Sequence, residues 1–197
     1  MARPVEIDRA TATRNARALF WRKGYLATSL RDLLAITHMG KGSFYAAYGS
    51  KEALFVQTLD WYHLMSQATR DEVSLTHRGL DALEQFLNIT LINVSAQKRK
   101  RGCLLVNTVI ELEGVEPKLY NRAKEYLQTL ENACLDFLLT AKDSGELRKD
   151  LKPEDLAQLC ATLLQGLRVD ARLGYDRALL SQRITLFRQL IATPQEA

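Results

Sequence analysis

The hydrophobic residues recur at helical spacing in each segment between the glycines of the chain. Ala12, Ala16, Leu19 and Phe20 lie at i, i+4, i+7 and i+8, which places them on one side of a helix from about Val5 to Lys23. No segment alternates between apolar and polar residues as a half-buried strand does. Because glycines and a proline divide the sequence into about nine helical segments, the pattern predicts an all-α protein.

Two short helices and a longer one follow Gly24, a residue suited to ending the first helix. Thr28 or Ser29 is expected to cap a helix of about two turns. A second short helix covers Lys41–Tyr48, and a longer one runs from Lys51 to about Thr69. The inward-facing residues expected in these three helices are Leu30, Leu33, Leu34, Phe44, Tyr48, Leu54, Phe55, Leu59, Tyr62 and Met65.

The two short helices form a recognisable unit together with the first helix. A tight turn at His38 and Met39 joins them, and this arrangement on a longer first helix is typical of a helix-turn-helix unit. We expect this DNA-binding domain to cover residues 1–50. A helical domain over residues 51–197 follows, with Ser50 as the cap of its first helix.

The second domain contains further helices with strong apolar stripes. A helix begins near Leu80, the run QKRKR is expected to be a loop, and GCLLVNTVIELEG forms another helix. Three longer helices cover about Glu116 to Lys142, Asp155 to Leu173 and Arg177 to Ile191. The last two carry more apolar surface than one small bundle needs, so we predict a homodimer with a four-helix interface. The alternative is that this surface packs within one chain.

Small, basic and hydroxyl-bearing residues gather on the helix Lys41–Tyr48, opposite its aromatic side. A helix that enters the major groove of DNA needs small residues for close approach, hydroxyls for base edges or phosphates, and cations for the backbone. Lys41, Gly42, Ser43 and Tyr45 meet these needs. Tyr45 could instead belong to the core and Ser43 could be an ordinary surface hydroxyl, but the inward side is already occupied by other aromatic residues.

The charged residues are distributed unevenly along the chain. The net charge is +4, but residues 1–51 carry a net +6 and residues 52–197 a net −2. A positive field confined to the first quarter is typical of a nucleic-acid-binding domain on a nearly neutral partner domain. A solvated basic surface is the simpler explanation of the same charges.

The segments LFWRKGYLATSLRDLL and KGSFYAAYGSKEALF resemble the DNA-binding domain of the TetR (tetracycline-repressor) family of bacterial transcriptional regulators. The resemblance covers about residues 10 to 60 and implies a dimeric repressor that binds a pseudopalindromic operator on double-stranded DNA and leaves it when a small molecule binds the second domain. One departure is the turn, where His38-Met39-Gly40 stands for the usual Gly-Val-Ser, so His38 must adopt an extended or left-handed conformation. The residues that the resemblance assigns to DNA are Thr28, Ser29, Tyr45 and Lys51 for phosphates, and Lys41, Gly42 and Ser43 for bases.

The second domain is long enough to enclose an effector cavity. Arg168 is the most informative candidate, because a cation on a helix packed among helices either pairs with an acid or receives an anionic ligand. We expect the pairing with an acid. The residues predicted for the effector site are Trp61, Tyr62, Phe86, Cys103, Asn107, Tyr126, Gln165 and Arg168.

Cys103 suggests a second kind of effector response. It follows the basic run QKRKR and stands at a helix N-terminus, and both features favour a reactive thiolate. The alternative function is therefore a repressor that senses oxidants or electrophiles through Cys103, whereas the simpler interpretation is a small buried hydrophobic residue. Cys134 and Cys160 are expected to be structural.

Several other classes of protein find little support in the sequence. No HExxH, GxSxG, phosphate-binding loop or paired carboxylates stand in a recognisable setting, so we expect no enzyme, no metal and no cofactor. No apolar run reaches the roughly 18 residues of a membrane span, and a cytoplasmic location is the default expectation. An architectural DNA-binding protein without an effector is a further alternative, but the second domain is large for dimerisation alone.

Overall fold

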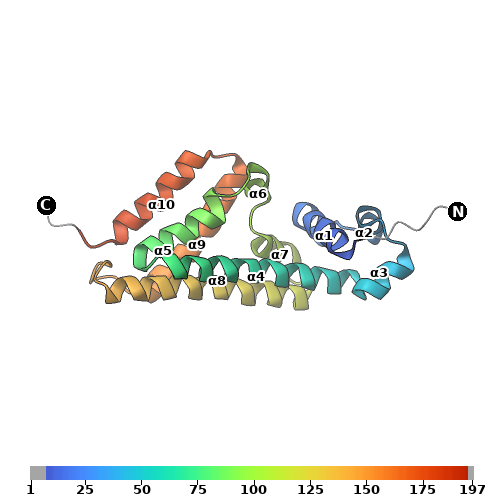
Figure 1. The fold of residues 1–197 in the computed structure, drawn as a ribbon, viewed down its shortest axis with the longest axis horizontal. Helices are drawn as coiled ribbons and strands as arrows, with labels where there is room; N and C mark the ends of the chain where they lie inside the picture. Colours follow the sequence, from blue (N-terminus) through green and yellow to red (C-terminus); the bar gives the residue numbers. More distant parts are fainter. Residues whose placement is uncertain (1–7, 195–197) are drawn as a thin grey trace.

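The computed structural model of the protein describes residues 8–194, so the predicted start of the first helix at Val5 lies outside them. The all-α prediction is confirmed, since these residues form ten α-helices, one π-helical segment and no strand (Figure 1). The elements are α1 (Arg9–Lys23), α2 (Leu30–Thr37), α3 (Lys41–Tyr48), α4 (Lys51–Thr76), α5 (Gly79–Leu87), η1 (Asn88–Ile92), α6 (Ala96–Arg101), α7 (Leu104–Leu112), α8 (Pro117–Asp143), α9 (Pro153–Leu173) and α10 (Arg177–Ile191).

Helices α1, α2 and α3 form a head, residues 8–50, at one end of an elongated molecule (Figure 1). Asp8 caps α1 by accepting hydrogen bonds from the backbone N–H groups of the first turn. Ser29 caps α2 and shares a capping box with Asp32. His38 ends α2 in the left-handed conformation, with φ 56°, which is one of the two conformations expected for it in the His38-Met39-Gly40 turn.

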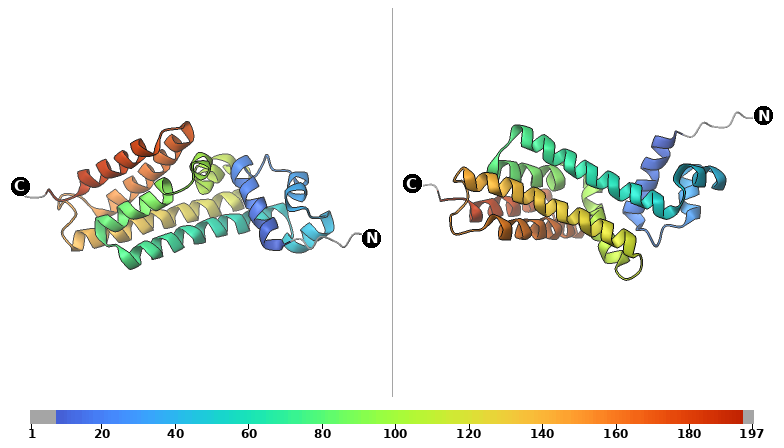
Figure 2. Two further views of the ribbon diagram at one scale, coloured as in Figure 1. Left: turned by 45° about the horizontal axis from the view of Figure 1, so that its top comes forward. Right: turned by 90° about the horizontal axis from the view of Figure 1, so that it is seen from below.

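Helices α4 and α8 run side by side along the remaining part of the chain, the body (residues 51–194; Figures 1 and 2). Side-chain hydrogen bonds join Lys118 to Glu52, Tyr126 to Asp60 and Thr129 to His63. Each pair has the same separation of 66 residues, so the two helices run in the same direction and in register. The long α4 therefore links α3 of the head directly to the far end of the body.

Three local predictions about the body were wrong. Helix α4 continues to Thr76 instead of ending near Thr69, because no helix-breaking residue occurs before Gly79. The QKRKR segment belongs to helix α6 and not to a loop, because Ser95 caps it and Gly102 ends it with φ 69°. Met65 is 50% exposed and does not belong to the core.

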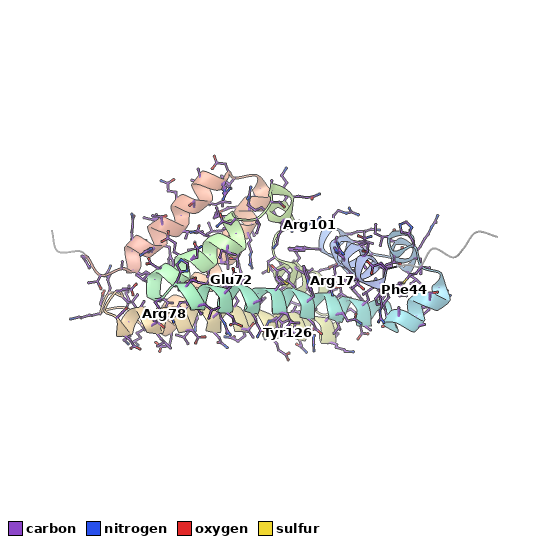
Figure 3. All side chains as sticks on the ribbon, viewed as in Figure 1. Arg17, Phe44, Glu72, Arg78, Arg101 and Tyr126 are labelled. Atoms are coloured by element: carbon purple, nitrogen blue, oxygen red, sulfur yellow. The ribbon has the colours of Figure 1, made fainter. Side chains whose placement is uncertain are left out.

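Two hydrophobic clusters fill the molecule. The first joins Phe20, Phe44 and Phe55 of the head and of the start of α4 to leucines of α7 and α8, so the head and the body share a core at their junction. The second lies at the far end of the body among α5, α8, α9 and α10. Figure 3 shows Phe44 in the head and Arg17 and Arg101 at the junction.

Most of the apolar surface on α9 and α10 packs within the chain. The interface predicted there is too broad, because α9 and α10 close the second cluster over α5 and α8. The residues of that prediction that are buried within the chain are Leu156, Cys160, Leu164, Leu167, Leu180, Ile184, Phe187 and Ile191. An outward stripe remains, with exposed Leu159, Val169 and Leu173 on α9 and Leu186 and Leu190 on α10.

Candidate nucleic-acid interface and ligand cavity

Helix α3 is anchored to the head by its aromatic side. Phe44 is 0% exposed and Tyr48 is 4% exposed, as predicted. The Tyr48 hydroxyl shares a hydrogen bond of 2.9 Å with the Thr13 hydroxyl of α1, and Arg9 donates to the Ala47 carbonyl oxygen at 2.6 Å. These contacts fix the rotation of α3, so its opposite side faces outward.

The outward side of α3 has no packing role inside the chain. Lys41, Gly42, Ser43 and Tyr45 are all exposed. Within residues 8–194 the side chains of Lys41, Ser43 and Tyr45 take part in none of the hydrogen bonds or ion pairs found, so their polar groups remain available. A Cβ added at Gly42 would meet no atom within 4 Å, so nothing inside the chain requires a glycine there. The missing side chain leaves room for the backbone to approach another molecule.

Of the two residues predicted at the start of α2, only Ser29 lies on the surface. Its hydroxyl accepts a hydrogen bond from the backbone N–H of Asp32 at 3.1 Å and donates one to the Asp32 carboxylate at 2.8 Å. The same carboxylate forms an ion pair of 2.5 Å with Lys23. Thr28 is 0% exposed, and its hydroxyl donates to the Gly24 carbonyl oxygen at 2.6 Å. The prediction that the Thr28 side chain meets phosphate is therefore wrong, because this threonine closes the turn before α2.

Lys51 is only partly exposed and is engaged inside the molecule. Its ammonium nitrogen lies 4.2 Å from the centre of the Tyr25 ring. Burial lowers the pKa of Lys51, while the nearby Glu111 and Glu116 act in the opposite direction. A phosphate contact would require Lys51 to leave the ring, so its assignment to DNA stays a prediction.

A set of contacts that the sequence did not predict holds the head against the body. The Glu111 carboxylate of α7 accepts hydrogen bonds from the backbone N–H groups of Tyr25 at 2.9 Å and Leu26 at 2.8 Å. The Trp21 indole N–H donates to the Gly102 carbonyl oxygen at 3.1 Å, and Arg101 lies over its ring.

A cavity of about 140 Å³ lies beside this junction. Three of the predicted effector residues line it, namely Trp61, Tyr62 and Arg168. Trp21 and Lys98 also line it but were not predicted, because they come from α1 and from the segment expected to be a loop. The remaining lining residues are Met65, Ser66, Thr69, Ile89 and Thr90.

Four predicted effector residues lie elsewhere. Phe86 is 0% exposed in the second cluster, and Gln165 does not line the cavity. Tyr126 stacks on His63 and donates to Asp60 at 2.8 Å on the α4–α8 contact. Asn107 lines a separate cleft of about 490 Å³ between head and body, where Arg172 donates to it at 3.0 Å.

Cys103 is the N-cap residue of α7, as predicted, but its side chain is only 3% exposed. The Tyr62 hydroxyl donates to its sulfur at 3.6 Å. The thiol therefore lies behind the Tyr62 wall and does not line the cavity itself. Cys134 and Cys160 are buried and unbridged in the body, consistent with a structural role.

A helix-turn-helix head with an exposed, small-residue helix, joined by one long helix to an all-helical body, defines the class of DNA-binding transcriptional regulators. Residues 13–58 match the family described as bacterial regulatory proteins, tetR family, and residues 79–187 match the tetracyclin repressor-like C-terminal domain. The chain belongs to the TetR family of bacterial regulators, as the resemblance implied.

Relatives that match nearly the whole chain are also transcriptional regulators. The transcriptional repressor ComR of Escherichia coli is 28% identical over 183 residues, covering 91% of this chain and 87% of its own. A solved structure of a cysteine mutant of the TetR-family regulator CifR, in complex with a 26-base-pair operator, is 27% identical, covers 96% of this chain and 100% of its own, and has a TM-score of 0.81. The reduced form of E. coli NemR, at 22% identity, covers 95% of this chain and 99% of its own, and its TM-score of 0.80 supports the fold.

In the part of the chain that the structure describes, no group of three or more His, Cys, Asp or Glu side chains could hold a metal ion. No helix among residues 8–194 is long and apolar enough to cross a membrane.

Proposed function

We propose that the protein is a repressor that binds a pseudopalindromic operator through the α3 helices of two copies, and that a small molecule in the body releases it. The observation that carries this proposal is the outward side of α3, where exposed polar groups without internal partners surround a glycine that the fold does not need. The operator complex of the CifR mutant supports the binding of DNA. The similarity to the repressor ComR supports repression of transcription over activation. We propose a binding function in the cytoplasm, with no catalysis and no cofactor.

We assign the exposed residues of α3 to bases or to phosphates according to their position and length. Lys41, Gly42 and Ser43 stand in its first turn, where a helix that enters the major groove meets base edges. Tyr45 is 43% exposed and extends its hydroxyl beyond the helix, so we assign it to phosphate together with Ser29. This division makes the first turn of α3 responsible for sequence choice.

The outward stripe on α9 and α10 supports a homodimer. Exposed leucines and a valine recur at helical spacing along both helices, and two copies of this stripe would cover each other in a symmetric four-helix interface. A dimer is also what a pseudopalindromic operator requires, since each half-site takes one α3.

The position of the cavity supports ligand release. Trp21 of α1 forms part of the cavity wall and also donates to Gly102 at the head–body junction. A ligand that displaces the Trp21 side chain would change how α1 rests on the body, and the population would shift toward heads whose spacing no longer matches the operator.

Selection of duplexes from a random pool, followed by binding measurements at stated salt, tests the proposal. The purified chain should enrich two inverted half-sites about one helical turn apart, or slightly more. Loss of binding on addition of a ligand to the complex would support the release step. Enrichment of no sequence at low salt would refute the DNA-binding role.

A second candidate function, release by an electrophile at Cys103, is favoured by one observation. The thiol stands at the head–body junction, with the Tyr62 hydroxyl against its sulfur. Modification of this sulfur would push on Tyr62 and on the wall of the cavity. If it is correct, Cys103→Ser binds DNA normally but no longer responds to electrophiles, whereas persisting release in this variant would reject it.

A further inference from the structure

The cavity contains two cationic side chains and no acidic one. Arg168 reaches it from α9 and Lys98 from α6, and none of its other lining residues is charged. The prediction that Arg168 pairs with an acid is wrong: none of the ion pairs found within residues 8–194 involves Arg168 or Lys98. Two neighbouring cations without a carboxylate leave a positive charge that the fold itself does not neutralise.

The groups next to Arg168 do not supply a negative charge. Burial raises the pKa of Tyr62 well above its usual range, so its hydroxyl stays neutral. Burial disfavours the charged form of Arg168, but a guanidinium group keeps its proton throughout the ordinary pH range, so Arg168 stays charged. Burial, followed by the nearby Arg168, lowers the pKa of Lys98. The positive charge of Arg168 is therefore felt by Lys98 inside the cavity.

The other wall residues suit an apolar group. Trp21, Trp61 and Ile89 provide flat or branched apolar surfaces. The hydroxyl groups of Thr69 and Thr90 donate to the backbone carbonyl oxygens of Met65 and Phe86, at 3.0 and 2.8 Å, so they offer no free proton in this arrangement. The cavity therefore combines charged donors with apolar and aromatic surfaces.

The volume of the cavity, which is partly open to solvent, suits a small ligand. About 140 Å³ is close to the roughly 150 Å³ of engineered apolar cavities that hold a single benzene ring. A single ring or a short branched chain with one small polar head group fills such a space.

We propose that the cavity binds a small organic monoanion, an aromatic or short branched carboxylate whose charged group lies on Arg168 and Lys98 and whose apolar part lies against Trp21 and Trp61. Guanidinium groups bind carboxylates with two parallel hydrogen bonds, which makes Arg168 the main anchor. The proposal names the chemical class of the effector and rests on the proposed ligand response only for its effect on DNA.

The two tryptophans make the site directly measurable. The chain contains two tryptophans, and both line the cavity, so intrinsic fluorescence of the full-length protein reports its occupancy without DNA. Benzoate and isovalerate serve as anionic probes, and benzyl alcohol, isoamyl alcohol and benzylamine as neutral and cationic counterparts. The anions should bind at least about tenfold more tightly than their counterparts, because a hydrogen-bonded charge pair contributes about 1.5–3 kcal/mol.

Variants separate the anion site from general effects of charge. Arg168→Gln should weaken benzoate binding by about tenfold or more, and Lys98→Gln by a smaller factor. Arg172→Gln is the matched control, since Arg172 lies on the same helix but bonds Asn107 outside the cavity, and it should bind benzoate like the wild type. Circular dichroism melting of each variant identifies loss of folding. The proposal is overturned if no anion binds better than its neutral counterpart, or if folded Arg168→Gln keeps the preference.

A second readout distinguishes this proposal from the proposed function. Fluorescence anisotropy of labelled operator DNA follows release by the same probes. If benzoate occupies the cavity through Arg168 but the DNA stays bound, the anion site stands and the ligand-release function fails. If a neutral compound occupies the cavity and releases DNA while the anions do not bind, the release function stands and the anion proposal fails.

Discussion

At the residue scale, each side chain of α3 is assigned by where it points and whether it already has a partner. Phe44 and Tyr48 are buried, whereas Ser43 and Tyr45 are exposed with no hydrogen bond from their side chains in the described residues. The sequence could predict this division because it follows from the period of one helix. It could not predict that the Thr28 hydroxyl turns inward to Gly24, because the choice between Thr28 and Ser29 depends on the path of the turn.

Ser43 and Tyr45 should behave differently on DNA. Ser43→Ala should change the preference among bases in the selected half-site, because a base contact is lost. Tyr45→Phe should weaken binding to selected and random duplexes by similar factors, because a phosphate contact carries no sequence information. Anisotropy titrations on both kinds of duplex decide this, and equal losses of sequence preference in the two variants would refute the assignment.

Asp32 predicts a pH dependence of stability. Hydrogen bonds from Lys23 first, and then from the Ser29 backbone N–H and hydroxyl, hold the pKa of Asp32 well below its usual value. Because the folded-state pKa is lowered, this stabilisation is present above the ordinary carboxyl pKa of about 4 and is lost as the pH falls toward the lowered value. The difference in melting temperature between wild type and Asp32→Asn should therefore shrink below about pH 4. A difference that is the same at every pH would contradict the assignment.

At the element scale, most helix boundaries were predicted closely, and the exceptions are the end of α4 and helix α6. Ser29 and Ser50 cap α2 and α4 as expected, because a polar residue before an apolar stripe is a local signal. The end of α4 was placed too early although no helix-breaking residue occurs before Gly79, and α6 was missed although Ser95 and Gly102 are local start and stop signals. The boundary between domains 1–50 and 51–197 stays a prediction, since one hydrophobic cluster crosses it.

Helix α7 holds the head through Glu111. Glu111→Ala removes the acceptor of the Tyr25 and Leu26 backbone N–H groups, so the head should lose part of its coupling to the body. We expect the variant to bind operator DNA within about threefold of the wild type but to respond less to a releasing ligand, as a loss of about 1 kcal/mol of coupling implies. Glu113→Ala, on the exposed residue just after α7, is the matched control. Full ligand response in folded Glu111→Ala would contradict this role.

At the scale of the whole molecule, the cavity and the head–body junction arise from elements that are far apart in the sequence. Trp21, Lys98 and Arg168 belong to α1, α6 and α9, and no local pattern predicts that they meet. The sequence could indicate Trp61 and Tyr62, because they follow the buried stripe of α4. It misplaced Phe86 and Tyr126, because a helical stripe does not tell a cavity wall from a core or an interhelix contact.

The outward stripe on α9 and α10 predicts the oligomeric state. Leu159→Glu combined with Leu190→Glu places charges in the proposed dimer interface, and we expect a monomer with at least about tenfold weaker operator binding. Leu75→Glu is the control, because Leu75 is 82% exposed on α4 and lies outside the stripe. Light scattering after size-exclusion chromatography measures the mass. A double variant that remains a dimer would show that the copies meet elsewhere.

The central claim is that the outward side of α3 approaches DNA closely, and Gly42 tests it most directly. Gly42→Leu should leave the fold intact, because no atom lies within 4 Å of an added Cβ and leucine favours a helix over glycine by roughly 0.5–1 kcal/mol. The same side chain should stop α3 from reaching the base edges. The decisive measurement is the affinity of this variant for the selected operator, together with its melting temperature. The control is Ala68→Leu, at an exposed position of α4, for which the same two quantities are measured. We predict an unchanged or higher melting temperature with operator binding weakened by at least about tenfold, whereas a folded Gly42→Leu protein that binds the operator as tightly as the wild type would contradict the account.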